Sequence, residues 1–308
     1  MVASTEYELL QHSVGLFERA GRAKLSLGGA EAAEFLQGQV TNDVEALAPG
    51  RGCYAALLTH KGKMRADMRI LRGADWIWLD SEPGARELLI KTVRMYSIGR
   101  DVNVRDVTDE YTILSLIGPQ ARAVLDVEPP AEEHALVDGA HGRYVTTDLG
   151  VDVICAAESA AAVRAALGVE TVSEEAVECV RVEGGRPRHG IDTTADTIPE
   201  EAGLNERAVS FTKGCYVGQE TVARLHYKGK PNRMLRGLRL SAAAEPGAEV
   251  RTEERQVGVL GSTARSPVHG EIALAILRRE VGPGDTVTVD GTAAEVVALP
   301  FEPARTHA

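Results

Sequence analysis

The residues with the clearest chemical potential lie together in one octapeptide, Lys-Gly-Cys-Tyr-Val-Gly-Gln-Glu at 213–220. Cys215 stands between a glycine and a tyrosine, with Lys213 two residues before it and an amide–carboxylate pair, Gln219 and Glu220, after it. Glycines permit tight backbone bends, and a nearby ammonium group favours the thiolate form of a cysteine. The pattern indicates a reactive thiol. A lone cysteine is also often a small buried hydrophobic residue, and these residues alone leave both interpretations open.

The other three cysteines offer no partner for a metal site. Cys53, Cys155 and Cys179 are far apart in the sequence, form no C-x-x-C pair and have no histidine at metal-ligand spacing. We therefore expect no self-contained zinc or iron–sulfur site. Few cysteines in a chain of this size also favour reduced thiols over a disulfide framework.

Composition is that of an ordinary globular protein. The chain has 308 residues, 44% of them hydrophobic, and a formal net charge of −11. This length predicts about two or three structural units. No apolar run approaches the roughly 18 residues of a membrane helix, and the first residues resemble neither a secretory signal nor a transit peptide. We expect no membrane partner and a cytoplasmic location.

Charge is unevenly distributed along the chain. Three windows, 60–72, 86–105 and 213–239, are rich in lysine and arginine, whereas 126–210 is rich in acidic residues. The basic windows predict either a local site for an anion or separate solvated surfaces, and the sequence leaves both alternatives open.

The first two thirds of the chain show mixed helix and strand patterns. Capping-box spacings at 5–8 and 171–174 each predict the start of a helix. Proline at 119 suits the first turn of a further helix. The predicted helices begin at 5 and 171 or cover 30–37, 119–125 and 159–167, and the predicted strands cover 76–79, 111–117 and 151–155.

The last third changes to short strands separated by turn residues. A P-G-x-x-V element occurs at 246–250 and again at 283–287, each time predicting a turn just before a strand. A small antiparallel barrel is expected, because closure or packing removes the unpaired edges of short strands. The predicted strands are 235–240, 257–260, 272–277, 287–289 and 295–299.

The octapeptide resembles the hallmark of the YgfZ family, which has a mitochondrial counterpart in iron–sulfur assembly. Residues 35–44 and 61–67 are similar to an N-terminal block that this family shares with the glycine-cleavage T-proteins, and 181–192 with 198–204 resemble a central folate-domain block. The resemblance spans about 30–239. It implies an α+β fold: a T-protein-like, folate-binding body of mixed helices and sheets at 1–230, expected to hold two subdomains, and a C-terminal antiparallel β-barrel at 231–308.

The ligand that the resemblance implies is tetrahydrofolate or a one-carbon derivative. Glu183 would accept the two parallel donors of the pterin edge, unless it is a surface glutamate of a helix. Tyr54 would stack on the ring, unless it is a core tyrosine. Gln219 and Glu220 would order the loop, and Arg224 would counter a ligand anion. The residues assigned to the folate are Glu183, Tyr54, Tyr216, Gln219, Glu220 and Arg224.

Asp67 separates the enzymatic from the non-enzymatic interpretation. The T-protein block carries an Asp-Asp pair that supports one-carbon transfer, and here the pair is Ala66-Asp67. Asp67 would be catalytic only in a transferase, so whether the chain is an enzyme is left open. The octapeptide and the shorter chain favour an accessory protein, in which Cys215 is the functional thiol and Lys213 tunes its charge.

The function implied by the resemblance is support of iron–sulfur cluster assembly or repair, with folate bound. Expected partners are assembly or client proteins, including radical enzymes that modify tRNA, and direct contact with nucleic acid is not expected. One alternative is a tetrahydrofolate-dependent aminomethyltransferase of the T-protein type. Another is a folate-binding module without thiol chemistry.

Overall fold

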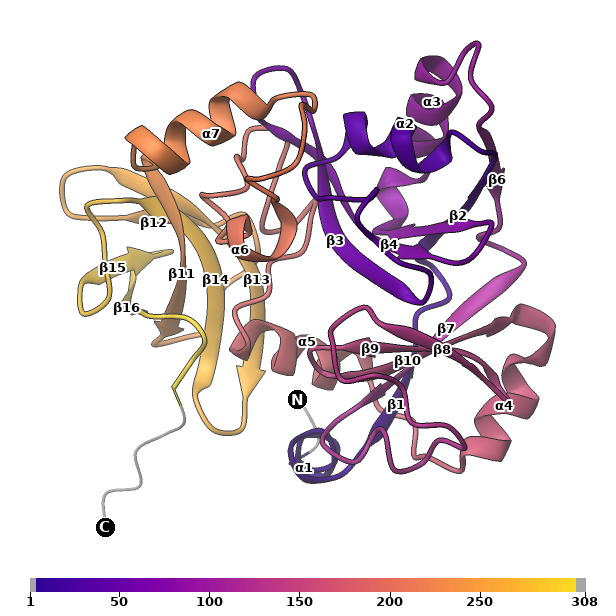
Figure 1. Ribbon diagram of the computed structural model, residues 1–308. Helices are drawn as coiled ribbons and strands as arrows, with labels where there is room; N and C mark the ends of the chain where they lie inside the picture. Colours follow the sequence, from indigo (N-terminus) through magenta and orange to yellow (C-terminus); the bar gives the residue numbers. More distant parts are fainter. Residues whose placement is uncertain (1–3, 303–308) are drawn as a thin grey trace. The chain divides into compact units, whose positions relative to one another are not determined.

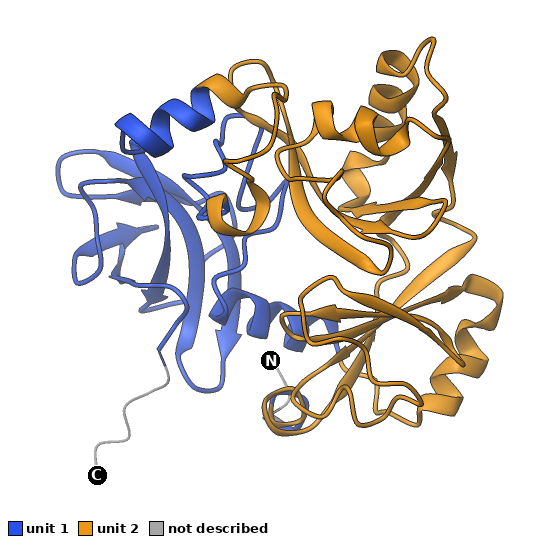
Figure 2. Cartoon of the chain, in the orientation of Figure 1, with its two compact units in different colours: residues 1–7, 173–204, 221–308 blue, residues 8–172, 205–220 orange. Residues whose placement is uncertain are grey.

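The computed structural model describes residues 4–302, and the chain forms two compact units (Figure 2). Unit 1 comprises residues 1–7, 173–204 and 221–308, and unit 2 comprises residues 8–172 and 205–220. This division differs from the predicted boundary at residue 230. The barrel begins close to that boundary, but its unit also includes helical segments from earlier in the chain.

Unit 2 is built on two five-stranded antiparallel sheets (Figure 1). In spatial order, the strands of the first sheet are β3 (Arg51–Leu58), β4 (Met64–Arg72), β5 (Ile77–Ser81), β2 (Ala23–Gly28) and β6 (Asn103–Asp106). The strands of the second sheet are β1 (Gly15–Glu18), β7 (Tyr111–Ile117), β10 (Gly150–Ala156), β9 (Gly142–Thr147) and β8 (Leu136–Gly139). The central strands β4, β7 and β10 are buried along most of their length, as expected for strands covered on both faces.

Short helices cover one face of each sheet. Phe35 and Leu89 join the apolar core of the first sheet, and Val163 joins that of the second. The positive φ of Gly29 (104°) turns the chain just before the first of these helices, a conformation that glycine adopts without steric cost. The helices of unit 2 are α2 (Ala32–Gln39), α3 (Arg86–Tyr96), α4 (Ala160–Leu167) and α6 (Asn205–Ala208), with single 3-10 turns at Pro83–Ala85 and Ala157–Ser159.

The two sheets of unit 2 also share an apolar cluster. Leu71 and Trp78 of the first sheet pack with Ile113 and Val145 of the second. The Trp78 ring meets Tyr111 edge-on, with ring centroids 5.4 Å apart, a favoured aromatic geometry. The layers of unit 2 are therefore helix, sheet, sheet and helix.

Unit 1 contains the predicted barrel. Its six antiparallel strands close on themselves, so that no sheet edge is left open (Figure 1). Both P-G-x-x-V elements precede strands, and those two strands, β12 and β15, pair through Val250 and Val289. In spatial order the strands are β11 (Arg233–Leu240), β14 (Gly270–Arg278), β13 (Gln256–Ser266), β12 (Glu249–Arg251), β15 (Thr286–Val289) and β16 (Thr292–Val297).

Three further helices complete the fold. The N-terminus of α5 (Glu174–Glu183) is capped by Ser173, whose hydroxyl accepts a hydrogen bond from the amide of Ala176. The other two, α1 (Ser4–His12) and α7 (Gln219–Lys228), each contain residues of both units. Among the described residues, no helix is long and apolar enough to cross a membrane.

Two sequence-based expectations about elements were wrong. The predicted helix at 119–125 is a series of turns with short-range backbone bonds such as Ala121 N to Gly118 O. The Arg122 guanidinium bonds to the carbonyl of Pro129 and holds this segment against the proline pair that follows. The barrel has six strands rather than the five predicted. The strand missing from the prediction is β12, whose three residues are too few to show a periodic pattern.

Candidate functional site

The 213–220 loop presents Cys215 at the surface between two buried neighbours. Lys213 and Tyr216 are buried at 8% exposure each, whereas Cys215 is exposed. The amide of Val217 bonds to the carbonyl of Gly38, and Gly218, with φ of 87°, lies too close to the Thr59 carbonyl to carry a side chain. The loop is therefore anchored on both sides of the thiol.

Lys213 anchors the loop through its ammonium group. Its Nζ donates to the backbone carbonyls of Gln37 at 2.6 Å, Val40 at 2.7 Å and Asn42 at 2.8 Å. Gln37 lies in the last turn of helix α2, Val40 is its C-cap and Asn42 follows it, and a cation is favourable at a helix end whose backbone acceptors lack helical partners. Three bonds use all three ammonium protons, so the geometry gives Lys213 an anchoring role. That Lys213 also tunes the charge of Cys215 stays a prediction.

The other cysteines differ from Cys215 in burial. Burial raises the pKa of Cys53 to about 12, although Lys213 opposes the shift. Burial also raises the pKa values of Cys155 and Cys179. Because the thiolate is the reactive form, these three thiols are protected at neutral pH, and Cys215 is the one exposed cysteine of the chain.

The α7 residues that the sequence assigned to a ligand are accessible. Glu220 and Arg224 are exposed and Gln219 is half-buried. Within residues 4–302, the side chains of these three residues make no hydrogen bond or ion pair. The backbone amide of Gln219 bonds to the Tyr216 carbonyl, so the loop runs directly into the helix.

Tyr54 and Asp67 meet on neighbouring strands of unit 2. The hydroxyl of Tyr54 on β3 is hydrogen-bonded to the carboxylate of Asp67 on β4, and burial together with that negative charge raises the pKa of Tyr54 well above its usual value. Asp67 is 5% exposed. The Arg207 guanidinium of α6 lies 5.6 Å from the centre of the Tyr54 ring, within cation–π distance. An aromatic face, a carboxylate and a cation are thus gathered in one place.

Arg207 and His134 are functional candidates that the sequence reasoning missed. Arg207 pairs with Glu133 and lies 3.5 Å from an Asp148 carboxylate oxygen. The His134 side chain is 12% exposed, and its buried Nδ1 has no hydrogen-bond partner. Burial, with Arg69 and Arg207 nearby, lowers the pKa of His134 to about 4, so the ring is neutral at physiological pH. No local motif signals these residues, because Arg207 lies on helix α6 and His134 in a turn before β8, far apart in the sequence.

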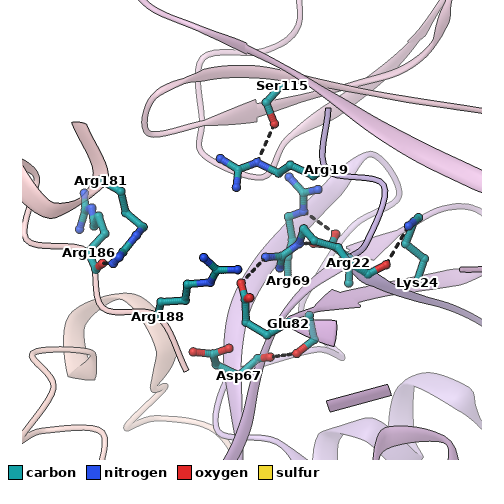
Figure 3. Close-up of polar contacts among 12 residues, drawn as sticks. Arg19, Arg22, Lys24, Asp67, Arg69, Glu82, Ser115, Arg181, Arg186 and Arg188 are labelled. Atoms are coloured by element: carbon teal, nitrogen blue, oxygen red, sulfur yellow. Dashed lines mark hydrogen bonds and ion pairs between the residues drawn. The ribbon is translucent and has the colours of Figure 1, made fainter. Parts of the chain in front are cut away.

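A network of buried and partly buried charged residues supports this region, and Figure 3 labels its members Arg22, Arg69 and Glu82. Arg69 donates from Nε to Asp80 at 2.7 Å and from Nη1 to Asp152 at 2.6 Å, joining the two sheets of unit 2. Arg22 donates to Asp80 at 3.0 Å and to Glu82 at 2.9 Å. Burial alone would raise the pKa of Asp80, but Arg69 and Arg22 hold it below its usual value. The positions of β4 and β10 are fixed by these bonds.

Glu183 lies in unit 1, at the end of α5, and is 8% exposed. Its carboxylate accepts hydrogen bonds from the Tyr7 hydroxyl at 2.9 Å and from the Ser266 hydroxyl at 2.5 Å. The thiol of Cys179 lies 3.7 Å away. Glu183 therefore joins α1 and α5 to strand β13. A pterin would have to share this carboxylate with Tyr7 and Ser266.

The residues of unit 2 suit a heteroaromatic ligand better than a metal. Within the described residues, no group of three or more His, Cys, Asp and Glu side chains could hold a metal ion. A pterin has ring donors and acceptors. Tyr54, Asp67 and Arg207 offer complementary groups, and so does the Nδ1 of His134, which lies near Arg207 and has no hydrogen-bond partner among residues 4–302. The donor set therefore fits the folate that the sequence implied.

Comparisons with known proteins agree with the fold and the motifs. Residues 1–137 match the family model described as the GCVT N-terminal domain. The chain is 27% identical to the tRNA-modifying protein YgfZ of Colwellia psychrerythraea, over 79% of this chain and 76% of the relative. It is 29% identical to an aminomethyltransferase of Synechococcus sp., over 96% of this chain and 90% of the relative.

A solved structure extends the similarity to the whole fold. The glycine cleavage system aminomethyltransferase T from Bartonella henselae superposes with a TM-score of 0.87 and 25% sequence identity, covering 97% of this chain and 89% of that chain. The predicted resemblance to the YgfZ proteins and the T-proteins is confirmed. So is the predicted α+β, T-protein-like architecture with a C-terminal antiparallel barrel.

Proposed function

We propose that this chain, a relative of the YgfZ proteins and the aminomethyltransferases, binds tetrahydrofolate or a one-carbon derivative and supports iron–sulfur cluster assembly or repair. Its clients would include enzymes that modify tRNA. The observation that carries the proposal is the exposure of Cys215 on an anchored loop, while the other three cysteines are buried or half-buried. We further propose protein partners rather than nucleic acid, and a cytoplasmic location.

The folate would bind in unit 2 around Tyr54. The ring of Tyr54 would stack on the pterin. The polar edge of the pterin would then meet Asp67 and the unpartnered Nδ1 of His134. The guanidinium of Arg207 would stabilise negative charge on the ligand. Glu183 stays a candidate for the pterin donors, and Tyr216, Gln219, Glu220 and Arg224 stay candidates for the remainder of the ligand, because they lie in or just after the Cys215 loop.

Cys215 would act as a soft, accessible sulfur. A cysteine thiolate binds iron or exchanges with other thiols, whereas a serine hydroxyl does neither at neutral pH. An iron–sulfur cluster would be the cargo of the reaction and would not remain bound, which agrees with the lone exposed thiol and with the absence of a metal-binding cluster among residues 4–302. The buried side chains of Lys213 and Tyr216, on either side of Cys215, would keep the thiol at the surface.

The second candidate is an aminomethyltransferase. The similarity to the Synechococcus and Bartonella proteins favours it. Asp67 would then be the catalytic carboxylate. Its hydrogen bond with Tyr54 and its low exposure keep it in a defined orientation, but the second acid of the T-protein pair is replaced by Ala66. A third candidate is a folate-binding module without thiol chemistry.

Two assays on the purified chain distinguish these candidates. The proposed function predicts tetrahydrofolate binding by calorimetry without glycine-cleavage T activity, whereas a transferase would show both. Binding, absence of T activity and full cellular function of Cys215→Ser would together identify a simple folate module. Absence of tetrahydrofolate binding would contradict all three candidates.

The thiol is tested by Cys215→Ser, with Cys155→Ser as a matched control. We expect Cys215→Ser to abolish support of iron–sulfur enzymes in cells that depend on this chain, with thermal stability and folate affinity unchanged. The control removes a buried thiol and should act through stability alone, at a cost of about 1 to 3 kcal/mol if the hydroxyl finds no partner. Full cellular activity of Cys215→Ser would overturn the proposed role of the thiol.

A further inference from the structure

Strand β11 of unit 1 carries three arginines, and one of them lacks an acidic partner. Arg233 donates twice to the Glu201 carboxylate, at 2.9 Å each. Arg239 lies 3.7 Å from Glu295. Within the described part of the chain, Arg236 makes no ion pair. This strand belongs to the third basic window of the sequence, and Arg236 is the residue of β11 that could hold a foreign anion.

The Arg236 guanidinium is poorly satisfied by the protein itself. Its Nε is buried without a hydrogen-bond partner. Its Nη1 lies 3.4 Å from the carbonyl of Leu235, which is a long contact, and its Nη2 lies 3.5 Å from the sulfur of Met234, which is a weak acceptor. Burial lowers the pKa of Arg236, and no nearby carboxylate opposes the shift. A buried donor without a partner requires an explanation, and a missing ligand is one.

The strand places this guanidinium next to the position where the pairing of β11 with β16 begins. Leu238 belongs to the barrel core, and side chains alternate faces along a strand, so Arg236 shares its face. Strand β16 pairs with β11 only from Gly237 onward, so Arg236 lies just beyond that seam. Its neighbour on β14 is Ala275, which has a small side chain.

The chain before β11 adds positive charge at the same end of the strand. Helix α7 runs directly into β11 (Figure 1). Lys228 ends that helix and Lys230 follows it; both are exposed, and neither makes an ion pair among residues 4–302. A cluster of unpaired cations concentrates small anions nearby.

We propose that the beginning of β11 is a binding site for a small-molecule oxyanion, a carboxylate or a phosphate, held by Arg236. The planar guanidinium presents parallel N–H donors that match both groups. The buried Nε would gain the acceptor that the protein does not supply. Lys228 and Lys230 would attract the anion without fixing its orientation. This site uses none of the residues of the proposed function and does not depend on it.

Binding of inorganic phosphate and of tri-γ-glutamate to the full chain tests the proposal. We expect saturable binding of at least one probe by calorimetry and a matching rise in the thermal midpoint. The probe that binds more tightly identifies the source of the oxyanion. Absence of saturable binding by either probe would overturn the proposal.

Two variants of equal charge locate the site. Arg236→Met should weaken binding at least about tenfold, as expected when a charge-assisted contact is lost. Arg239→Met removes the same charge three residues away and should leave affinity unchanged. Arg236→Lys should fall between wild type and Arg236→Met, because an ammonium group lacks the parallel donors. Equal losses in the two methionine variants would overturn the assignment in favour of general charge attraction.

Stability measurements keep the variant test interpretable. Arg236→Met replaces a partly buried, unpaired cation by an apolar side chain, so we expect no loss of thermal stability without the anion. The rise in midpoint on adding the probe should be lost in Arg236→Met and retained in Arg239→Met. A rise of the same size in Arg236→Met would place the anion elsewhere.

Discussion

Replacing Lys213 by methionine tests whether this residue anchors the loop or acts on the thiol. Methionine keeps most of the length of the side chain and removes all three donors. The carbonyl of Val40 would be left without a hydrogen-bond partner, because Val40 is 1% exposed and water cannot replace the lysine. Water can reach the carbonyls of the half-buried Gln37 and Asn42. One buried carbonyl without a partner and two carbonyls that exchange the ammonium group for water correspond to a loss of about 2 to 4 kcal/mol in the free energy of unfolding.

The assay combines urea unfolding with alkylation of Cys215 at pH 7, followed by peptide mass spectrometry. The sequence motif predicted that Lys213 stabilises the thiolate, which would make alkylation slower in Lys213→Met. The structure predicts a less stable protein whose Cys215 reacts at least as fast as in wild type, because the ammonium protons are bound by carbonyls. The buried thiols of Cys155 and Cys179 report global unfolding in the same samples.

Lys61→Met is the matched control, since Lys61 is exposed and makes no ion pair within the described residues. It should change neither stability nor alkylation. A Lys213→Met variant with wild-type stability and about tenfold slower alkylation of Cys215 would refute the anchoring argument and restore the interpretation from the motif.

Three further substitutions probe the charged groups of the two units. Glu183→Gln should lower the free energy of unfolding by about 1 to 3 kcal/mol by weakening the bonds from Tyr7 and Ser266. Tetrahydrofolate affinity reduced about tenfold in calorimetry would support the pterin contact, and unchanged affinity would remove Glu183 from the site. His134 has a folded pKa of about 4, below its ordinary 6.5, so the unfolded state binds more protons between these values. Stability should therefore fall as pH drops from 6.5 to 4, by up to about 3 kcal/mol, and urea titrations should show less of this loss in His134→Gln. Arg69→Met should cost about 3 to 5 kcal/mol in urea unfolding by leaving Asp152 buried without its cation, whereas Arg105→Met, at an exposed pair, should cost less than about 1 kcal/mol.

The sequence predicted features that depend on local spacing. The barrel strands follow turn residues at regular intervals, and both P-G-x-x-V elements precede strands, as predicted. The Cys215 loop was recognisable because its residues are adjacent. The first P-G-x-x-V element predicted a turn before a strand, but β12 was not among the five predicted strands, since no alternation can be read from three positions. The helix predicted at 119–125 failed because a proline at a first turn does not ensure that the following residues continue as a helix.

Contacts between distant residues could not be predicted. The partners of Lys213 lie more than 170 residues earlier in the chain. His134, Arg207 and Tyr54 come from a turn, a helix and a strand that are far apart in the sequence, and only the tertiary fold brings them into one unit. No single sequence encodes such register explicitly.

The basic windows contain both paired and unpaired arginines, and the count of charges does not tell the two apart. In the 86–105 window, Arg86 pairs with Asp106 at 2.7 Å, Arg100 with Glu34 at 3.2 Å and Arg105 with Glu110 at 2.9 Å. Most of that charge is therefore neutralised on the surface. In the third window Arg236 has no such partner. Net charge in a window does not distinguish these cases, because the partners come from other segments.

The discontinuous make-up of the two units sets an order for folding during synthesis. Unit 2 needs residues 205–220 as well as 8–172, because the Thr41 hydroxyl bonds to the carbonyl of Ala208 and the amide of Ser210 to the carbonyl of Thr41. The Cys215 loop must therefore leave the ribosome before unit 2 is complete, and the barrel strands follow it in the chain. Unit 1 cannot be complete until strand β16 has been synthesised, although its residues 4–7 and 173–204 come much earlier in the chain.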